Sequence, residues 1–353
     1  MQDFINELSG RIKQHAAGKA PLSIRAGGSK AFYGAATMGE QLDMRAYSGI
    51  IDYEPQELVL TVRAGTPLAE IEAVMAKKRQ MLPFEPPRFA DGATIGGTVA
   101  SGLSGPRRPY TGAARDFVLG TRIINGKGED LHFGGRVIKN VAGYDVSRLM
   151  TGAMGTLGVL LDISLKVLPT PGAELTLRFE LDEASAIQRV NEWAGKPLPL
   201  SASSWYENVL LLRLSGTASG VKAAQEKLGG EVIEAPTANI FWADLRDHRA
   251  AFFHGSEPLW RVSLPSTTPQ LNLNMPQWIE WGGALRWLRG IADAKILRAK
   301  VATLGGHVTL FKNGEKSVGV FHPLAPKLVE IHRNLKAAFD PANILNRGRM
   351  DSF

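Results

Sequence analysis

Three glycines, Gly152, Gly155 and Gly158, recur at intervals of three residues directly before an apolar run. Each glycine costs roughly 0.5–1 kcal/mol of backbone entropy relative to alanine, so a packed core has little use for such a row. A backbone that must pass close to a flat or charged ligand does have a use for it. The spacing differs from Gly-x-Gly-x-x-Gly, so a Rossmann dinucleotide turn is a poor fit. The row therefore predicts a ligand site of another architecture.

Two earlier segments repeat this concentration of small residues. The first, with Gly27 and Gly28, follows a strand predicted over residues 22–25. Successive backbone N–H groups in such a turn form a concave nest that holds a pyrophosphate. The second covers residues 94–102, whose hydroxyls and bare backbone suit a ligand lying along the chain. Each segment alone is explained as well by a tight turn or by close packing as by a ligand site. Three such segments in one domain favour a ligand site.

Composition narrows the class of protein. A chain of 353 residues, 44% hydrophobic and 21% charged, suits a soluble globular protein of two or three domains. The net charge of +7 suits an anionic ligand, an anionic membrane surface or an acidic partner. The only tight basic pair near the glycine segments is Arg107-Arg108, so nucleic-acid binding is weakly supported. The absence of cysteine excludes disulfides, thiolate-bound zinc, Cys-ligated iron–sulfur clusters and a cysteinyl link to a cofactor.

The N-terminus reads as an amphipathic helix with Phe4, Ile5, Leu8 and Ile12 on one side, without the apolar core of a signal peptide. No apolar run reaches the roughly 18 residues of a membrane span. We therefore expect a cytoplasmic protein, at most peripheral at the inner face of the cell membrane.

The best domain boundary is Pro169-Thr170-Pro171, beyond which the pattern of predicted strands and helices changes. A β-α-β-β-α-β order is predicted over residues 175–233, and a looser second round follows to residue 311. All seven tryptophans lie after residue 192. We expect four of them in the core of this sheet, with a partner interface as the alternative: Trp260, Trp278, Trp281 and Trp287.

Several motifs together resemble a known family. Arg25-Ala26-Gly27-Gly28-Ser29, then Thr94-Ile95-Gly96-Gly97, Arg115-Asp116-Phe117-Val118-Leu119-Gly120 and Gly155-Thr156-Leu157-Gly158-Val159 follow the order of a PCMH-type FAD-binding domain, the vanillyl-alcohol-oxidase-like flavoprotein family. The terminal Asp340-Pro341…Asn346-Arg347-Gly348-Arg349 resembles that family's Asp-Pro…Asn-Pro-Gly-Lys, with Arg347 in place of the usual proline. Residues 139–145 and the short second half are most similar to the glycolate-oxidising branch of the FAD-linked D-2-hydroxy-acid dehydrogenases.

The resemblance implies an α+β fold with two domains. Residues 1–170 would form the PCMH-type FAD-binding domain of two α/β subdomains. Residues 171–353 would form a C-terminal cap domain with a split β-α-β (ferredoxin-like) sheet, and residues 340–349 would return to the FAD-binding domain.

The resemblance also assigns roles. Residues 25–30 would wrap the FAD pyrophosphate, Pro86 and residues 94–97 would line the dinucleotide, and Gly158 and Val159 would offer backbone to the adenine. The implied cofactor-binding residues are Arg25, Ala26, Gly27, Gly28, Ser29, Lys30, Pro86, Thr94, Ile95, Gly96, Gly97, Gly102, Gly158 and Val159. A cluster of polar residues precedes the glycine row. It would order the loop near the flavin, face a partner or cap a helix, and its members are Lys139, Asn140, Tyr144 and Asp145.

Two departures from the family pattern bear on chemistry. Many covalent members carry a histidine beside the first glycine pair, whereas this chain has Gly28-Ser29, so FAD is expected to be non-covalent. Catalytic members of the branch carry a Gly-Glu-His-Gly motif, and the nearest match here is Gly305-Gly306-His307-Val308, without the carboxylate. We therefore expect no metal site, and His307 is a weak candidate base that better suits a core or interface position.

The implied function is that of an FAD-binding subunit of a glycolate (D-2-hydroxy acid) dehydrogenase complex. Its partners would be an iron–sulfur subunit that passes electrons toward quinone and a second FAD-binding subunit that contributes the missing base and metal cluster. Two alternatives remain. One is a free-standing FAD oxidoreductase with its own substrate pocket for a small 2-hydroxy acid, and the other is a structural flavin-binding subunit without catalysis.

Overall fold

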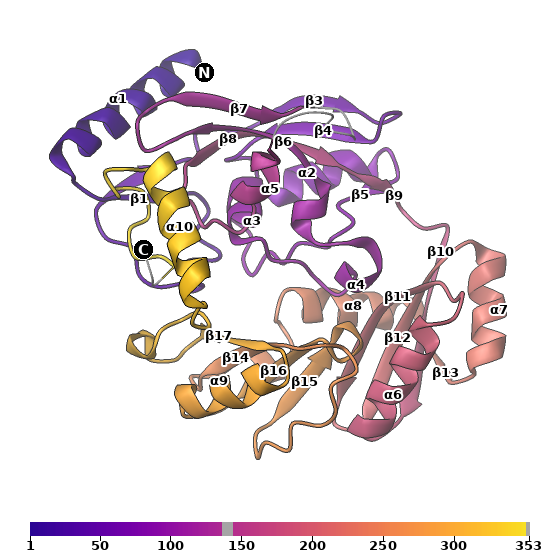
Figure 1. Cartoon of the computed structure of the whole chain (residues 1–353). Helices are drawn as coiled ribbons and strands as arrows, with labels where there is room; N and C mark the ends of the chain where they lie inside the picture. Colours follow the sequence, from indigo (N-terminus) through magenta and orange to yellow (C-terminus); the bar gives the residue numbers. More distant parts are fainter. Residues whose placement is uncertain (136–143, 351–353) are drawn as a thin grey trace.

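Two antiparallel β-sheets organise the chain, one of five strands in the first half and one of eight strands in the second (Figure 1). The computed structural model describes residues 1–135 and 144–350. The two sheets lie in separate bodies that face each other, and the C-terminal helix α10 runs back along the first body (Figure 1). The α+β fold class predicted from the sequence is confirmed.

The first half opens with helix α1 and a small parallel sheet of two strands. Its helices and strands are α1 (Gln2–Gly18), β1 (Leu22–Arg25), β2 (Glu40–Asp43), β3 (Ile50–Glu54), β4 (Val59–Arg63), α2 (Leu68–Ala76), β5 (Gln80–Met81), α3 (Ile95–Ser101), α4 (Arg108–Thr111), the 3-10 turn η1 (Ala114–Phe117), β6 (Val118–Ile124), β7 (Asp130–Gly134), α5 (Val146–Met150), β8 (Val159–Lys166) and β9 (Leu168–Pro169). The predicted amphipathic helix is correct, because Ile5, Leu8 and Ile12 are buried against Leu22 and Leu42 of the small sheet.

The five-stranded sheet, in the order β3-β4-β8-β6-β7, carries the main core of the first half. Helices α2 and α3 pack against it through Leu68, Ile71 and Ile95. Thr66 precedes α2 and has a side chain suited to an N-cap, but it does not cap the helix. The helix begins after Pro67. The Thr66 hydroxyl donates to the Arg63 carbonyl oxygen at 2.7 Å, and so stabilises the turn after β4 rather than the start of the helix.

The eight-stranded sheet, here called the cap sheet, is two mirrored four-stranded units joined at β11 and β15. Its order is β13-β10-β12-β11-β15-β16-β14-β17. The helices and strands of the second half are β10 (Ala173–Glu180), α6 (Glu183–Ala194), β11 (Leu200–Tyr206), β12 (Val209–Gly216), α7 (Ala218–Leu228), β13 (Glu231–Ile233), α8 (Ala235–Arg246), η2 (Ala251–Phe253), β14 (Leu259–Ser263), β15 (Gln277–Glu280), η3 (Trp281–Gly283), β16 (Leu285–Arg289), α9 (Ala294–Thr303), β17 (His307–Lys312), η4 (Lys316–Val318) and α10 (Pro326–Phe339).

The first of these units has the order of a split β-α-β sheet, as the sequence predicts. Helix α8 is an addition that the sequence reading did not identify. Pro236 lies in its first turn, where a missing N–H costs nothing. The core position predicted for four of the tryptophans is also confirmed, because all seven are buried. Trp242 of α8, for example, donates to Thr176 at 2.9 Å.

A buried ion network joins the two halves. Glu85, just before the Pro86-Pro87 turn, lies 3.2 Å from Arg107 in the first half and 2.9 Å from Arg213 of β12. Arg107 also lies 2.6 Å from Glu174 of β10. Burial alone would raise the pKa of Glu85, but Arg213 and Arg107 hold it below its usual range. The cap sheet is therefore held against the first half by paired, desolvated charges.

The C-terminal segment returns to the start of the chain. Leu345 pairs in parallel with Leu22 of β1. The Asn346 side chain accepts from the Ile24 amide at 2.7 Å and donates to the Met154 carbonyl oxygen at 2.6 Å. The last residues thereby connect two segments that are far apart in the sequence.

Lys336 and Asp340 fix this return. The Lys336 Nζ lies 2.7 Å from Asp340 Oδ2 and also donates to the carbonyl oxygens of Thr156 and Leu345. Asp340 in turn accepts from the amides of Ile344 and Leu345. Both side chains are almost completely buried, at 7% and 0% exposed.

We expect Asp340→Asn to lower the free energy of unfolding by about 3–5 kcal/mol, because the change leaves the Lys336 charge buried without its partner. The exposed pair Arg178–Glu231 provides a matched control, and Glu231→Gln should change the free energy of unfolding very little, because solvent screens the pair. Chemical denaturation of both variants measures the difference. Equal effects of the two changes would contradict the role given to the buried pair.

Candidate cofactor site

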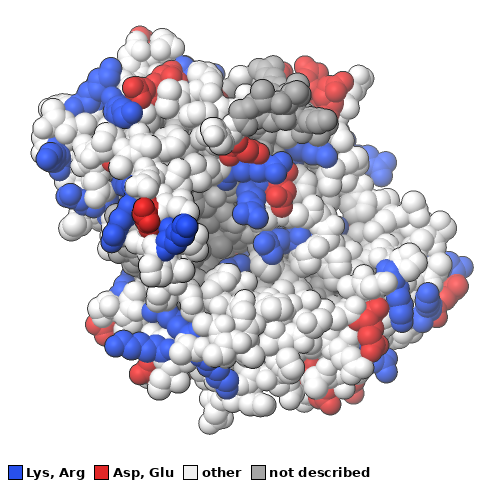
Figure 2. Space-filling model, viewed as in Figure 1, with Lys and Arg blue, Asp and Glu red and all other residues white. Residues whose placement is uncertain are grey.

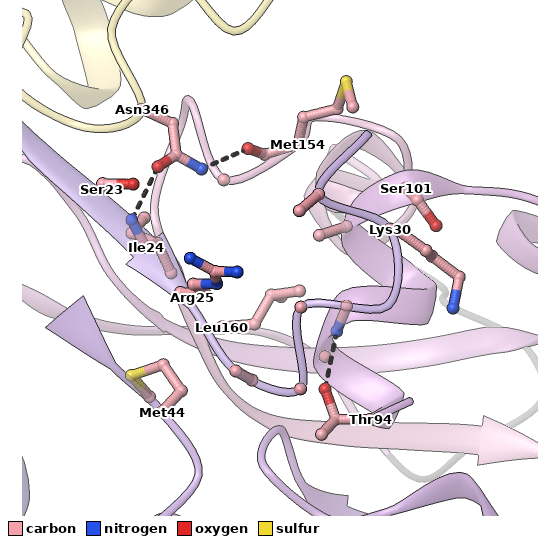
Figure 3. Close-up of a pocket in the computed structure, with 18 of the residues that line it drawn as sticks. Ser23, Ile24, Arg25, Lys30, Met44, Thr94, Ser101, Met154, Leu160 and Asn346 are labelled. Carbon is pink, nitrogen blue, oxygen red and sulfur yellow. Dashed lines mark hydrogen bonds between the residues drawn. The ribbon is translucent and has the colours of Figure 1, made fainter. Parts of the chain in front are cut away.

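A cavity of about 290 Å³ opens in the first half beside β1, a size at the lower limit for small-molecule sites. Four segments meet there: the turn after β1, the start of α3, the glycine row before β8, and the returning C-terminus (Figure 3). Its lining residues are Ser23, Ile24, Arg25, Ala26, Gly27, Gly28, Ser29, Lys30, Ala31, Ala36, Thr37, Met44, Ala64, Thr94, Gly96, Gly97, Ala100, Ser101, Met154, Gly155, Gly158, Leu160, Asn346 and Arg349.

The turn after β1 supplies free amide donors. Gly28 has a φ of +70°, which brings successive N–H groups to one side of the turn. The amides of Gly27, Gly28 and Ser29 donate to no acceptor within residues 1–135 and 144–350. Gly27 has a second role, because a Cβ there would lie 1.4 Å from the Gly92 carbonyl oxygen. The turn therefore needs one glycine for its conformation and another for close packing.

The second glycine segment forms helix α3. Thr94 caps it by accepting from the Gly97 amide at 3.3 Å, and Figure 3 shows this bond at the edge of the cavity. Gly96 packs so closely on Ala64, the residue that follows β4, that a Cβ on Gly96 would lie 2.7 Å from the Ala64 carbonyl oxygen. The close packing predicted for this segment is confirmed, and it brings the start of the helix to the cavity wall. Contact with a ligand there stays a prediction.

The three glycines of the row have two different roles. Gly155 and Gly158 line the cavity, whereas Gly152 donates to the Val99 carbonyl oxygen at 2.9 Å and packs on α3. A Cβ on Gly155 would lie 2.7 Å from Asn346 Nδ2. The Asn346 amide group can therefore bridge β1 and Met154 only because Gly155 has no side chain.

The cavity is electropositive. Arg25, Lys30 and Arg349 line it, and no Asp or Glu does so among the described residues. Burial and the nearby Arg25 charge lower the pKa of Arg349. Burial lowers the pKa of Lys30 to about 8, partly offset by Asp247. Three cations without a lining acid, together with free amides, favour an anionic ligand.

Ten of the fourteen predicted cofactor-binding residues line this cavity, and four do not. Ile95 and Val159 point into the hydrophobic core. Gly102 ends α3 with a φ of +64° and packs on Gly152. Pro86 is buried beside Glu85 at the junction with the cap sheet. These four residues shape the surrounding segments without facing the cavity.

The sequence reading missed the contributions of Met154 and Arg349. Arg349 donates to the carbonyl oxygens of Lys30, Ala31 and Ala35, and so holds the loop beyond the β1 turn. The terminal Asn346-Arg347-Gly348-Arg349 motif was a signal for a role of Arg349. The contacts themselves could not be read from the sequence, because they join residues more than 300 positions apart.

The polar group before the glycine row is only partly described. Lys139 and Asn140 lie outside the described residues. Asp145 caps α5 by accepting from the Arg148 amide at 3.1 Å, which agrees with the capping alternative. Tyr144 is 95% exposed.

His307 begins β17 on the face of the cap sheet that turns toward the first half, and it is exposed rather than part of a core. Partial desolvation and the charge of Arg261 lower its pKa. No group of three His, Cys, Asp or Glu side chains in the described part of the chain is arranged to hold a metal ion. None of the helices within the described ranges is long and apolar enough to span a membrane.

Comparison with known proteins identifies relatives over the whole chain. The family of FAD binding domains matches residues 5–134, and the family of FAD linked oxidases, C-terminal domain, matches residues 322–350. Glycolate oxidase subunit GlcE of Escherichia coli strain K12 is 48% identical over 99% of this chain and 97% of that protein. Glycolate oxidase subunit GlcD of Bacillus subtilis strain 168 is 24% identical over 85% of this chain and 77% of that protein.

The fold itself is shared with alkyldihydroxyacetonephosphate synthase, with a TM-score of 0.68 at 15% identity over 97% of this chain and 75% of that one. This likeness confirms the PCMH-type fold class expected from the glycine segments. The two domain matches occupy the parts of the chain that build the cavity, the first half and the returning C-terminus. With nearly half of all positions identical along its whole length to one relative, the chain belongs to the glycolate oxidase subunit GlcE family of FAD-linked oxidoreductases.

Proposed function

We propose that this chain is an FAD-binding subunit of a glycolate (D-2-hydroxy acid) oxidase complex that converts glycolate to glyoxylate. The observation that carries the proposal is the convergence of four separate segments on one cavity with free amides and three cations. A glycolate oxidase subunit is 48% identical over 99% of the chain, which supports the same assignment. The Bacillus subtilis relative is also named as a glycolate oxidase subunit.

The residues present suit FAD. The amides of Gly27, Gly28 and Ser29 and the guanidinium of Arg25 would hold the pyrophosphate, since both are donors matched to phosphate oxygens. Thr94, Gly96 and Gly97 would lie along the dinucleotide, and Gly158 would offer backbone near the adenine. FAD would supply the acceptor for the hydride of the 2-hydroxy acid, while the protein orients both groups and excludes water.

We infer that the flavin is held without a covalent bond. The cavity is lined by no His, Cys or Tyr side chain among the described residues, and the chain has no cysteine at all. Tight binding must then come from the charged donors and from the closed backbone around the cofactor.

The wider assembly is part of the proposal. We propose an FAD-binding domain over residues 1–170 and a cap domain over residues 171–353, with residues 340–349 completing the first domain. Electrons must leave through another chain, because no cysteine is available here for an iron–sulfur cluster. An iron–sulfur subunit and a second flavin subunit that supplies a base and metal cluster are the expected partners. The complex would lie in the cytoplasm, at the inner face of the membrane.

Purification of the full chain alone separates this proposal from its two alternatives. We expect a bound flavin whose absorbance stays oxidised with glycolate until the partner subunits are added. Bleaching by glycolate without partners would favour a free-standing enzyme. A flavin that no combination of partners and glycolate reduces would favour a structural role, and absence of flavin under all conditions would contradict the FAD site.

Acid precipitation should release the flavin into the supernatant, and flavin retained in the pellet would contradict non-covalent binding.

Arg25 provides a direct test of the cavity. Arg25→Met should weaken FAD binding roughly tenfold or more, because one charge-assisted contact to the pyrophosphate is lost. Arg45→Met on the following loop is the matched control, since Arg45 is 70% exposed and paired with Asp43. Titration of flavin fluorescence into the apoprotein measures both. The same affinity for the two variants would remove Arg25 from the site.

Lys30 makes FAD affinity depend on pH. Its pKa of about 8 means that the free protein loses this charge as the pH rises above 8. An anionic ligand favours the charged form, so affinity should be constant below pH 8 and fall by up to about tenfold per unit above it.

Lys30→Arg stays charged throughout and should flatten this dependence, measured by the same titration between pH 7 and 9.5. A wild-type profile that is flat, or a Lys30→Arg profile as steep as that of the wild type, would contradict the role of Lys30.

A further inference from the structure

Trp281 lies in a strained turn between the two halves. Its φ is +55°, and the next two residues, Gly282 and Gly283, also have positive φ values of 64° and 105°. A bulky residue in the left-handed region is rare and costly, and such outliers persist mainly where function requires them. The indole N–H donates to the Gly105 carbonyl oxygen at 3.1 Å, which anchors the ring across the interface.

Two arginines from different halves contact this ring. The Arg108 guanidinium, from α4, lies 4.6 Å from the ring centroid, and that of Arg261, from β14, lies 5.2 Å from it. Both distances are within the range of a cation–π contact. The indole thus brings two positive charges together where the two halves meet, and Figure 2 shows lysine and arginine side chains around the hollow between them.

Neither guanidinium has an ion-pair partner among residues 1–135 and 144–350. Arg108 and Arg261 make no hydrogen bond or ion pair through their side chains within the described part of the chain. Desolvation lowers the pKa of each, and the charge of Arg261 lowers the pKa of Arg108 further. The adjacent Arg107 differs, because Glu85 and Glu174 neutralise it.

The acid near Arg261 does not replace a counter-ion. Glu280 is 4% exposed and accepts a hydrogen bond from Trp287 Nε1 at 2.7 Å. Burial raises its pKa to about 7, which reduces its charge at neutral pH. Tyr33, the other group facing Arg261, has a pKa raised by burial and stays neutral.

The arginine pair is connected to the cofactor cavity. The segment that runs from α3 into the interface lines the FAD cavity at Ser101. Two residues later it lines, through Leu103 and Ser104, a small cavity that also contacts Arg261 and Glu280. A ligand held at the arginines would therefore lie next to the cofactor cavity.

We propose that Arg108 and Arg261, which both lie over the Trp281 ring, form a carboxylate-binding subsite for a small 2-hydroxy acid at the interface of the two halves. A guanidinium fork matches the geometry of a carboxylate, and the single negative charge of that carboxylate would offset one of the two positive charges and so reduce their repulsion. The identity of the carboxylate as glycolate rests on the proposed function, whereas the demand for an anion rests on the unpaired arginines alone.

The test is the binding of sodium glycolate to the FAD-loaded full chain, followed by calorimetry and by tryptophan fluorescence. Arg108→Met and Arg261→Met should each weaken glycolate binding roughly tenfold to a hundredfold, because a hydrogen-bonded charge is lost. Arg261→Lys should lose less. Arg115→Met is the control, since Arg115 is 68% exposed and lies close enough to affect Arg108 electrostatically; its affinity should change less than about twofold.

Stability gives a second readout. Removing one of the two like charges relieves their repulsion but also removes one cation–π contact with Trp281, so the melting temperature should change little. A large drop in the melting temperature would indicate a merely structural arginine. Binding of glycolate to both variants as tight as to the wild type would overturn the proposal, and so would the absence of glycolate binding by an FAD-loaded wild type.

Two competing ligands are separated by the same experiment. Loss of FAD with retained glycolate binding in the variants would assign the arginines to the flavin, and inorganic phosphate that competes as well as glycolate would make the site a general anion site. Either result would overturn the carboxylate assignment. Failure of the proposed function has a different signature, because the wild-type chain would then hold no FAD.

Discussion

The architecture of the cofactor cavity depends on the bridge that Asn346 makes between β1 and Met154. Its side chain satisfies the Ile24 amide and the Met154 carbonyl oxygen, two groups that neither the small sheet nor the glycine row pairs internally. The Lys336–Asp340 pair sets the path that brings Asn346 there. A cofactor wall is thus built from residues at both ends of the chain, and it exists only when the C-terminus has returned.

Charge is distributed unequally between structure and site. Where the two halves join, Glu85 binds Arg107 and Arg213, and such buried pairs are costly to break. In the cofactor cavity and beside Trp281, by contrast, arginines lie without acidic partners in the part of the chain described here. Partly buried cations without acidic partners favour the binding of anions. In the proposed account the cofactor cavity would bind a pyrophosphate, and the arginines beside Trp281 would bind a carboxylate. The paired network keeps the two sites next to each other.

The glycine segments could be predicted from sequence because their constraint is local. Gly28 needs its positive φ and Gly27 its missing Cβ, and both requirements are visible in the residue types. Helix α3 was less visible, since a run of glycines and small hydroxyls gives no apolar periodicity, and its start is fixed by Thr94 capping and by packing on Ala64. Arg349 and the arginine pair at Trp281 depend on contacts between distant segments, which no local pattern encodes.

The central claim is that one cavity, closed by the returning C-terminus, holds the flavin. Hydrogen–deuterium exchange of the full chain with and without FAD tests it most directly. The account predicts slower exchange on FAD binding in three separated regions, the turn after β1 with Gly27 and Gly28, the start of α3, and the Gly155 segment, together with residues 346–349. Protection confined to the cap sheet, or protection of the β1 turn without the C-terminal residues, would contradict it.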